Sequence, residues 1–218
     1  MFRYERPQKG RMRQFHQIGC ELIGPTSPLA DAEIISVGAA ILSELKVLPH
    51  TKLHLNSLGD QKSRLTYRQA LIDYLARYRS SLSEDSQRRL DSNPLRILDS
   101  KSEADQAILT EAPRLPSYLS NEAKEHFDGV LSLLTMPYEV NPRLVRGLDY
   151  YNNTVFEITA GELGAQNSIG GGGRYDGLSE VLGGPQVPGV GWAAGVERLA
   201  MLINKNVTPA RPLVAVLA

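Results

Sequence analysis

The stretch MFRYERPQKGRMRQFHQ, residues 1–17, is the most informative part of the sequence. Apolar residues alternate with polar ones on both sides of a segment rich in Arg and Lys, and Pro7-Gln8-Lys9-Gly10 supplies the residue types of a turn. The pattern predicts two paired strands, over residues 2–6 and 14–23, with a cationic loop between them. Arg side chains on such a loop can bind phosphate groups bidentately, so the hairpin suits a polyphosphate or a nucleic acid. A solvated charged turn is the alternative interpretation.

The overall composition restricts where such a site can lie. The 218 residues include 24 basic and 24 acidic ones, so no net charge attracts polyanions and any site for them has to be local. Cys20 is the single cysteine, which excludes an internal disulfide and suits a reducing compartment. The sequence has neither an apolar run of 18 residues nor a signal-type apolar segment. We therefore expect a soluble cytoplasmic protein without a membrane partner.

The order of the predicted elements indicates an α+β fold that is interrupted by helices. Apolar spacing predicts a helix over residues 30–48 and a strand over 51–58. Helical patterns then continue from residue 60 to about 134. Strand and helix patterns return at 153–159, 166–169, 189–195 and 196–204. We divide the chain into a first core segment (1–59), a helical insertion (60–137), a second core segment (138–208) and the first strand of a further domain (209–218).

Residues 144–157 place reactive side chains immediately before a predicted strand. Arg146 is followed by glycine and then by Tyr150 and Tyr151, so a cation and two phenolic hydroxyls would meet at the start of the strand. An edge turn with packed aromatic rings is the alternative.

Four consecutive glycines, Gly170–Gly173, precede Arg174 and Tyr175. Glycine lets the backbone approach a ligand or a neighbouring strand closely, whereas a flexible surface hairpin is the alternative. On the first predicted core strand, Gln17 and Glu21 lie four residues apart and therefore project to the same face.

Several common chemistries are excluded because their patterns are missing. No segment matches the phosphate-binding pattern G-x-x-x-x-G-K-[ST]. Residues 189–194 match a looser dinucleotide fingerprint, but Pro185 and Pro188 interrupt the strand that has to precede it. The histidines are scattered without metal-ligand spacing, so neither a zinc site nor a Cys/His nucleophile is predicted. Arginine electrostatics remain, and these are expected of phosphoryl or nucleotidyl transfer.

Together these segments resemble the histidyl-tRNA synthetases, a family of class II aminoacyl-tRNA synthetases. Residues 2–21 look like the family's motif 2 and residues 189–199 like its motif 3. Residues 144–151 and 170–178 are similar to its two histidine-specific segments. The matches follow the family's order through nearly the whole chain. The resemblance implies an antiparallel sheet flanked by helices, with a helical insertion.

The resemblance also implies a two-step reaction, in which ATP activates histidine to histidyl-adenylate and the histidyl group passes to tRNA(His). The implied catalytic residues are Arg3 and Arg146, on opposite sides of the α-phosphate. The implied ATP-binding residues are Arg3, Glu5, Phe15 and Arg198. The implied histidine-binding residues are Arg3, Gln17, Glu21, Arg146, Tyr150, Tyr151 and Tyr175. The implied contacts to the tRNA acceptor end are Arg6, Gln8, Arg11 and Arg13.

ATP chemistry implies Mg²⁺, for which no residue can be assigned, and the family forms homodimers. The sequence departs from the family's pattern because motif 1, which builds much of the dimer interface, is absent, and the anticodon-binding domain is represented at most by residues 213–218. We therefore expect this chain alone to be badly impaired in adenylate formation. ATP–pyrophosphate exchange near the level of the intact enzyme would contradict that expectation.

A catalytically silent relative, the histidyl-synthetase-like regulatory subunit of ATP phosphoribosyltransferase, is the alternative reading of the whole chain. Such a protein would keep the fold and lose the catalytic and pocket residues, which are present in this sequence.

Overall fold

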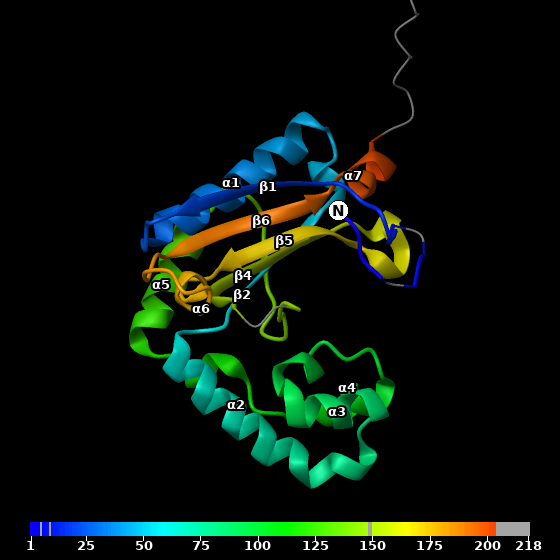
Figure 1. The fold of residues 1–218 in the computed structure, drawn as a ribbon, viewed down its shortest axis with the longest axis vertical. Helices are drawn as coiled ribbons and strands as arrows, with labels where there is room; N and C mark the ends of the chain where they lie inside the picture. Colours follow the sequence, from blue (N-terminus) through cyan, green and yellow to red (C-terminus); the bar gives the residue numbers. More distant parts are fainter. Residues whose placement is uncertain (5, 9, 148–149, 204–218) are drawn as a thin grey trace, which may run out of the picture.

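The computed structural model describes residues 1–4, 6–8, 10–147 and 150–203, and its strands form one sheet. The strands are β1 (Gln17–Ile23), β2 (Lys52–Ser57), β3 (Glu139–Val140), β4 (Asn152–Thr159), β5 (Ser168–Arg174) and β6 (Gly189–Gly195). Their order across the sheet is β1-β6-β5-β4-β2-β3 (Figure 1). Neighbouring strands are antiparallel except for the short β3, which pairs parallel with β2. The predicted sheet, antiparallel in its main part and flanked by helices, is confirmed.

The N-terminal hairpin closes as predicted but is less regular than two full strands. The amide of Arg3 donates to the carbonyl of Arg13 at 2.8 Å. Among the described residues of 2–6, the ladder is reduced to one isolated bridge, which Phe2 forms with residue 14. Phe2 and Tyr4 are 82% and 94% exposed, so this segment has no apolar face to bury and little to hold it in a longer ladder. Regular pairing begins at Gln17, where β1 meets β6.

The strands β5 and β6 are rich in glycine, and their packing requires it. A Cβ on Gly172 would lie 1.9 Å from the carbonyl oxygen of Gly191. Because β5 has a hydrogen-bonded neighbour on both sides, the ladder extends to Arg174, beyond the strand predicted over 166–169. The glycine run therefore serves close approach to neighbouring strands, and the flexible-hairpin alternative is wrong for it.

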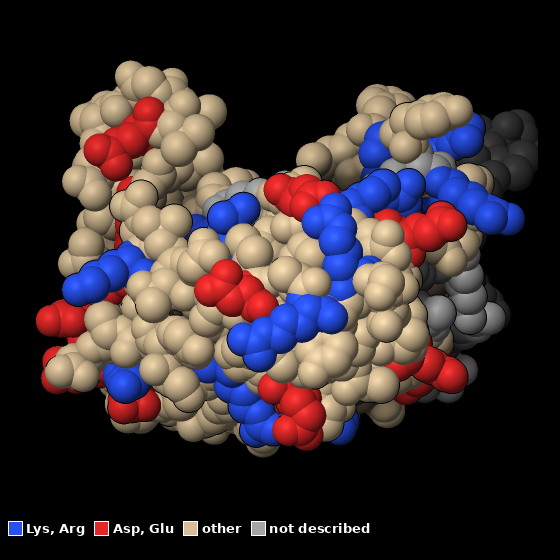
Figure 2. All heavy atoms as spheres, turned by 90° about the horizontal axis from the view of Figure 1, so that it is seen from below, with Lys and Arg blue, Asp and Glu red and all other residues tan. Residues whose placement is uncertain are grey.

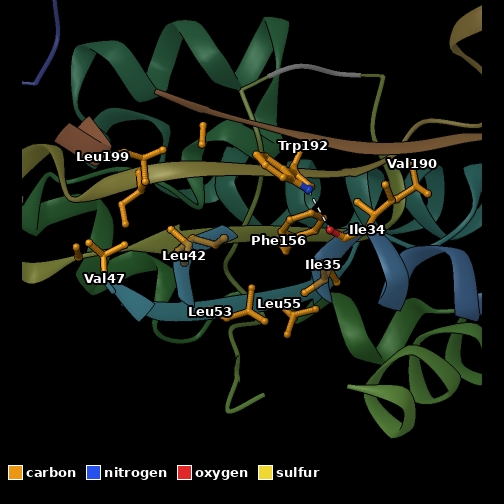
Figure 3. Close-up of a cluster of buried hydrophobic side chains, with 14 of the residues drawn as sticks. Ile34, Ile35, Leu42, Val47, Leu53, Leu55, Phe156, Val190, Trp192 and Leu199 are labelled. Carbon is orange, nitrogen blue, oxygen red and sulfur yellow. Dashed lines mark hydrogen bonds between the residues drawn. The ribbon is translucent and has the colours of Figure 1, made fainter. Parts of the chain in front are cut away.

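One face of the sheet is covered by α1 (Pro28–Glu44) and α5 (Asn121–Leu133), and the main core lies between them and the strands (Figure 3). Ile34 on α1, Phe156 on β4 and Trp192 on β6 meet there, and the Trp192 indole donates to the Ile34 carbonyl at 2.9 Å. Since side chains alternate along a strand, the neighbours of Trp192 on β6 face the opposite side of the sheet. That opposite side carries the candidate site.

The helices α2 (Gln61–Leu75), α3 (Glu84–Ser92) and α4 (Glu103–Leu109) gather around a second apolar core below the sheet in Figure 1. The remaining short helices are α6 (Leu178–Val181), α7 (Val196–Leu202) and the 3-10 turns η1 (Leu48–His50), η2 (Ala76–Ser81), η3 (Pro94–Ile97), η4 (Leu115–Tyr118) and η5 (Gly161–Gln166). Within the predicted insertion, α5 packs differently, because its Phe127 and Val130 belong to the main core. The insertion limits of 60–137 remain a prediction, and residues 209–218 lie outside the described part of the chain.

A buried ion pair ties the helical layer to the sheet. Asp31, in the first turn of α1, and Arg174, at the end of β5, are both 0% exposed, and Nη2 of Arg174 lies 2.7 Å from Oδ1 of Asp31. The Thr154 hydroxyl donates to the same carboxylate at 2.9 Å, and the His126 ring nitrogen also contacts it. Burial alone would lower the pKa of the Arg174 guanidinium, but its hydrogen bonds and charge interaction with Asp31 outweigh burial and raise that pKa. The four side chains come from α1, α5, β4 and β5, so they fix these elements to one another.

The helices within the described ranges include none that is long and apolar enough to cross a membrane.

Candidate active site

A pocket on the open side of the sheet brings together residues from both ends of the described chain. Five of the predicted site residues line it, namely Arg3, Phe15, Gln17, Arg146 and Arg198. Strand residues of β5 and β6 complete the wall, including Gly170 and Ala193. In Figure 2 the outline of the molecule is hollowed between two raised parts. Lys and Arg side chains gather on and beside the right-hand part, the side on which Figure 1 places the N-terminal hairpin.

The hairpin contributes a cation that is already oriented. The guanidinium carbon of Arg3 lies 4.3 Å from the centre of the Phe15 ring, and Nε donates to the carbonyl of Met12 at 2.9 Å. A cation stacked on an aromatic face and tied to backbone loses little further freedom when an anion binds.

Arg146 reaches the pocket from the segment before β4 and is held by a carboxylate. Its Nη1 donates to Oε1 of Glu157 at 2.9 Å, and a Cβ on Gly171 would lie 2.9 Å from the same nitrogen. Its Nε is buried and has no hydrogen-bond partner among the described residues. The Arg146 guanidinium is therefore held at a fixed position in the pocket wall, with its buried Nε–H unsatisfied within the described part of the chain.

Arg198, on α7, is a third cation in the pocket. Its Nε donates to the carbonyl of Gly10 at 2.7 Å and its Nη1 to the carbonyl of Ser168. Burial lowers the pKa of this guanidinium, and the neighbouring charges of Arg3 and Arg11 lower it further. Cations brought this close to one another favour an anionic ligand that would relieve their repulsion.

The tyrosines and Glu21 form a second cluster. The Tyr175 hydroxyl donates to Oε2 of Glu21 on β1. The Tyr150 ring centre lies 4.6 Å from that of Tyr151 and 6.0 Å from that of Tyr175. Burial raises the pKa of Tyr151, and a hydrogen bond with Tyr150 adds to the shift, whereas for Tyr175 burial and then Glu21 raise the pKa. Both phenols therefore stay protonated at neutral pH and can donate hydrogen bonds.

The glycines of β6 make room for this second cluster. A Cβ on Gly191 would lie 1.6 Å from Oε2 of Glu21, and one on Gly189 would lie 2.4 Å from the Tyr175 ring. Side chains at these two positions would displace the Glu21–Tyr175 pair, so glycine here is a requirement of the site as well as of the sheet.

The residues predicted to meet RNA lie at the hairpin loop. Arg6 and Gln8 are exposed, and Gln8 and Arg11 exchange two backbone hydrogen bonds at the tip, of 3.0 and 2.8 Å. The guanidinium carbon of Arg13 lies 5.2 Å from the centre of the Tyr4 ring. Glu5, predicted to contact adenosine, lies outside the described residues.

Sequence reasoning missed two carboxylates: one lines the pocket, and the other pairs with an arginine that lines it. Glu157, which pairs with Arg146, stands on β4, and Glu197, on α7, contacts His16 of the hairpin. Neither follows a periodic or spacing signal, because each pair joins elements that become neighbours only in the folded sheet. The part of the chain that the structure describes has no group of three or more His, Cys, Asp or Glu that could hold a metal ion.

An antiparallel sheet with an arginine-lined pocket on its open face is the architecture of a class II aminoacyl-tRNA synthetase catalytic domain. A family model described as histidyl-tRNA synthetase matches residues 1–199. The histidine–tRNA ligase of Rhodospirillum rubrum is 56% identical over 217 residues, which cover 98% of this chain and 52% of the relative. The chain belongs to the histidyl-tRNA synthetase family. It spans about half the length of the curated relatives it matches.

Solved structures agree with this assignment. Apo histidyl-tRNA synthetase from S. aureus has a TM-score of 0.72 at 37% identity, over 93% of this chain and 48% of that one. A protein described as an ATP phosphoribosyltransferase regulatory subunit/histidyl-tRNA synthetase from Bacillus halodurans has a TM-score of 0.54 at 22% identity, over 90% of this chain and 55% of that one. The second likeness concerns the fold alone, so the residues of the pocket have to distinguish an enzyme from a silent relative.

Proposed function

We propose that this chain is the catalytic part of a histidine–tRNA ligase, which activates histidine with ATP and transfers it to tRNA(His). Two groups of residues carry the proposal. Arg3, Arg146 and Arg198 line the pocket together with Gln17. Glu21, which accepts a hydrogen bond from Tyr175, lies four residues further along β1 than Gln17 and on the same face of the sheet. A silent regulatory relative would have no need to keep this set together, and we do not favour it.

In the first step, an oxygen of the histidine carboxylate attacks the α-phosphorus of ATP. The new oxygen–phosphorus bond gives histidyl-adenylate, and the bond to the β-phosphate oxygen breaks to release pyrophosphate. Negative charge on the α-phosphate oxygens is stabilised by the guanidinium groups of Arg3 and Arg146. Because both groups are held in place before the substrate binds, little reorganisation is needed during the reaction.

Recognition of histidine follows from the second cluster. A neutral imidazole has one N–H donor and one nitrogen acceptor. In our proposal the Glu21 carboxylate accepts from the ring N–H and the protonated Tyr151 hydroxyl donates to the other nitrogen, with Tyr150 and Tyr175 lining the pocket. Gln17, on the same face of β1 as Glu21, contacts the substrate amine. An amino acid without both ring nitrogens would leave buried polar groups unpaired and would be rejected.

The adenosine would lie between Phe15 and Arg198, with Glu5 on its edge. The Arg198 Nε–H donates to the Gly10 carbonyl in the plane of the guanidinium, so Arg198 can stack on adenine through its face while it still holds the loop tip. Mg²⁺ enters this proposal as the counter-ion of ATP, and no residue of the chain is assigned to it. We also propose that the protein forms a homodimer and acts in the cytoplasm.

Calorimetric titration with the non-hydrolysable sulfamoyl analogue of histidyl-adenylate tests the proposed function, because it requires binding at both parts of the site and no turnover. Binding of the analogue is the readout because it does not depend on the rate of any chemical step.

The hairpin loop gives a separate prediction about tRNA. The double variant Arg6→Gln/Arg13→Gln removes two of the proposed phosphate contacts and should weaken binding of tRNA(His) most strongly at low salt. The slope of log K against log salt should fall by about 2, one for each lost contact. Fluorescence anisotropy over a salt series measures the slope, and binding of the adenylate analogue should remain within about threefold.

Lys62→Gln/Lys124→Gln is the matched control for this prediction, since it removes two exposed charges from the starts of α2 and α5. An unchanged slope in the hairpin variant, or an equal loss in the control, would contradict docking of RNA by the loop.

A further inference from the structure

We propose that Glu197 is a positioning residue, which fixes the nucleotide and amino-acid parts of the site relative to each other by holding the backbone of His16. The inference rests on the proposed function. Its starting point is the end of the β1–β6 ladder at which β1 begins and β6 ends, where Gln17 pairs with Gly195. Beyond Gly195 the chain turns into α7, so β6 offers no carbonyl to the amide of His16.

The Glu197 carboxylate takes the place of that missing carbonyl. The backbone amide of His16 donates to Oε1 of Glu197 at 2.9 Å and to Oε2 at 3.1 Å. The ring nitrogen Nδ1 of His16 also lies 2.7 Å from Oε1 of Glu197. The amide of Val196 donates to the His16 carbonyl at 2.9 Å. Both backbone groups of His16 are therefore held by two consecutive residues of α7.

His16 lies between two residues assigned to different substrates. Phe15 and Gln17 project to the same side of the strand and both line the pocket, whereas the His16 side chain is 69% exposed. The same short piece of backbone carries the Phe15 ring, proposed to contact adenine, and the Gln17 side chain, proposed to contact the substrate amine. A shift of that backbone therefore moves both groups. The Arg3 guanidinium, 4.3 Å from the Phe15 ring centre, would move with them.

The alternative, that Glu197 itself contacts ATP, has less support. Both oxygens of its carboxylate already accept hydrogen bonds, and the bond from His16 lowers the pKa of the carboxyl group, so it stays ionised. A free carboxylate beside the phosphates would repel them. Glu197 therefore acts through His16.

Glu197→Ala is expected to lower kcat of histidine-dependent ATP–pyrophosphate exchange by about 100-fold, because a misplacement of about 1 Å is enough for such a loss. KM should rise for ATP and for histidine together. Glu197→Gln keeps one acceptor oxygen and should restore activity to within about tenfold of the unchanged chain. His16→Ala is the matched control, since it removes the imidazole and leaves the backbone amide, and it should stay within about threefold.

Hydrogen exchange supplies a readout that does not depend on turnover. In Glu197→Ala the His16 amide should exchange at least about tenfold faster, while the amides of the β1–β6 ladder keep their protection. An unchanged hydrogen-exchange rate of the His16 amide in Glu197→Ala, or a change in KM for only one of the two substrates, would overturn the inference. If the unchanged chain fails to bind the adenylate analogue, the proposed function is overturned. The hydrogen-exchange rate of the His16 amide would still show whether Glu197 holds this backbone.

Discussion

Arg146→Gln is expected to reduce histidine-dependent ATP–pyrophosphate exchange by about 10²–10³-fold, the loss that follows removal of one fixed donor from a site of developing charge. Arg146 lines the pocket with Arg3, and Glu157 holds its Nη1 at 2.9 Å. Glutamine keeps most of the length of the side chain and loses its charge. The rate is measured with labelled pyrophosphate at high protein concentration, as a ratio to the unchanged chain.

Two further variants isolate the charge of Arg146 from other effects. Arg143→Gln changes an arginine of the same segment whose guanidinium contacts Gln106 and the carbonyl of Leu109, outside the pocket, and it should stay within about threefold. Arg146→Gln combined with Glu157→Gln removes the carboxylate that the single variant leaves unpaired. If the double variant regains full exchange, the defect came from the unpaired Glu157 carboxylate, and our assignment of Arg146 to the α-phosphate is wrong.

Asp31→Asn is expected to lower the free energy of unfolding by about 3 kcal/mol, because it leaves a buried guanidinium without its main counter-charge. Arg174 is 0% exposed, and two of its nitrogens lie within 3.0 Å of Oδ1 of Asp31. Asparagine has nearly the same shape, so the loss reports on charge rather than on packing. Urea unfolding with a common slope for both proteins gives the difference.

Asp91→Asn is the control for the buried pair. Asp91 pairs with Arg79 at 2.5 Å, but both side chains are more than half exposed, so water and salt screen the pair and its loss should change stability far less. Similar losses in the two variants would mean that the Asp31–Arg174 pair is not effectively buried.

The sequence was sufficient for the features that depend on local pattern. The helices over α1, α2 and α5 follow from apolar spacing, and the glycine-rich strand at 189–195 was predicted with its observed limits. The grouping of Arg3, Phe15, Gln17, Arg146 and Arg198 depended on a resemblance to motifs of a family, and the structure brings these five residues to one pocket. Their roles toward ATP and histidine remain proposals.

Features that depend on contacts between distant segments could not be predicted. In the sequence, Asp31 is only an acidic residue near the start of a helix, and no local signal links it to Arg174. The sequence predicts a full strand over residues 2–6, whereas the described residues there form only one isolated bridge. Alternation of apolar and polar residues favours a strand, but it does not show whether a core exists for the apolar side chains to pack against. The contact of Glu197 could not be predicted for the same reason. Its partner is the backbone amide of His16, which has no strand partner because β6 ends at Gly195.

The most direct test of the account is calorimetric titration of the chain with the sulfamoyl analogue of histidyl-adenylate and with the corresponding alanyl analogue. We predict one binding site per chain for the histidyl analogue and an affinity at least about 100-fold weaker for the alanyl analogue, because Glu21 and Tyr151 would be left unpaired. Equal affinities, or the absence of binding, would contradict the claim that this pocket holds ATP and histidine together.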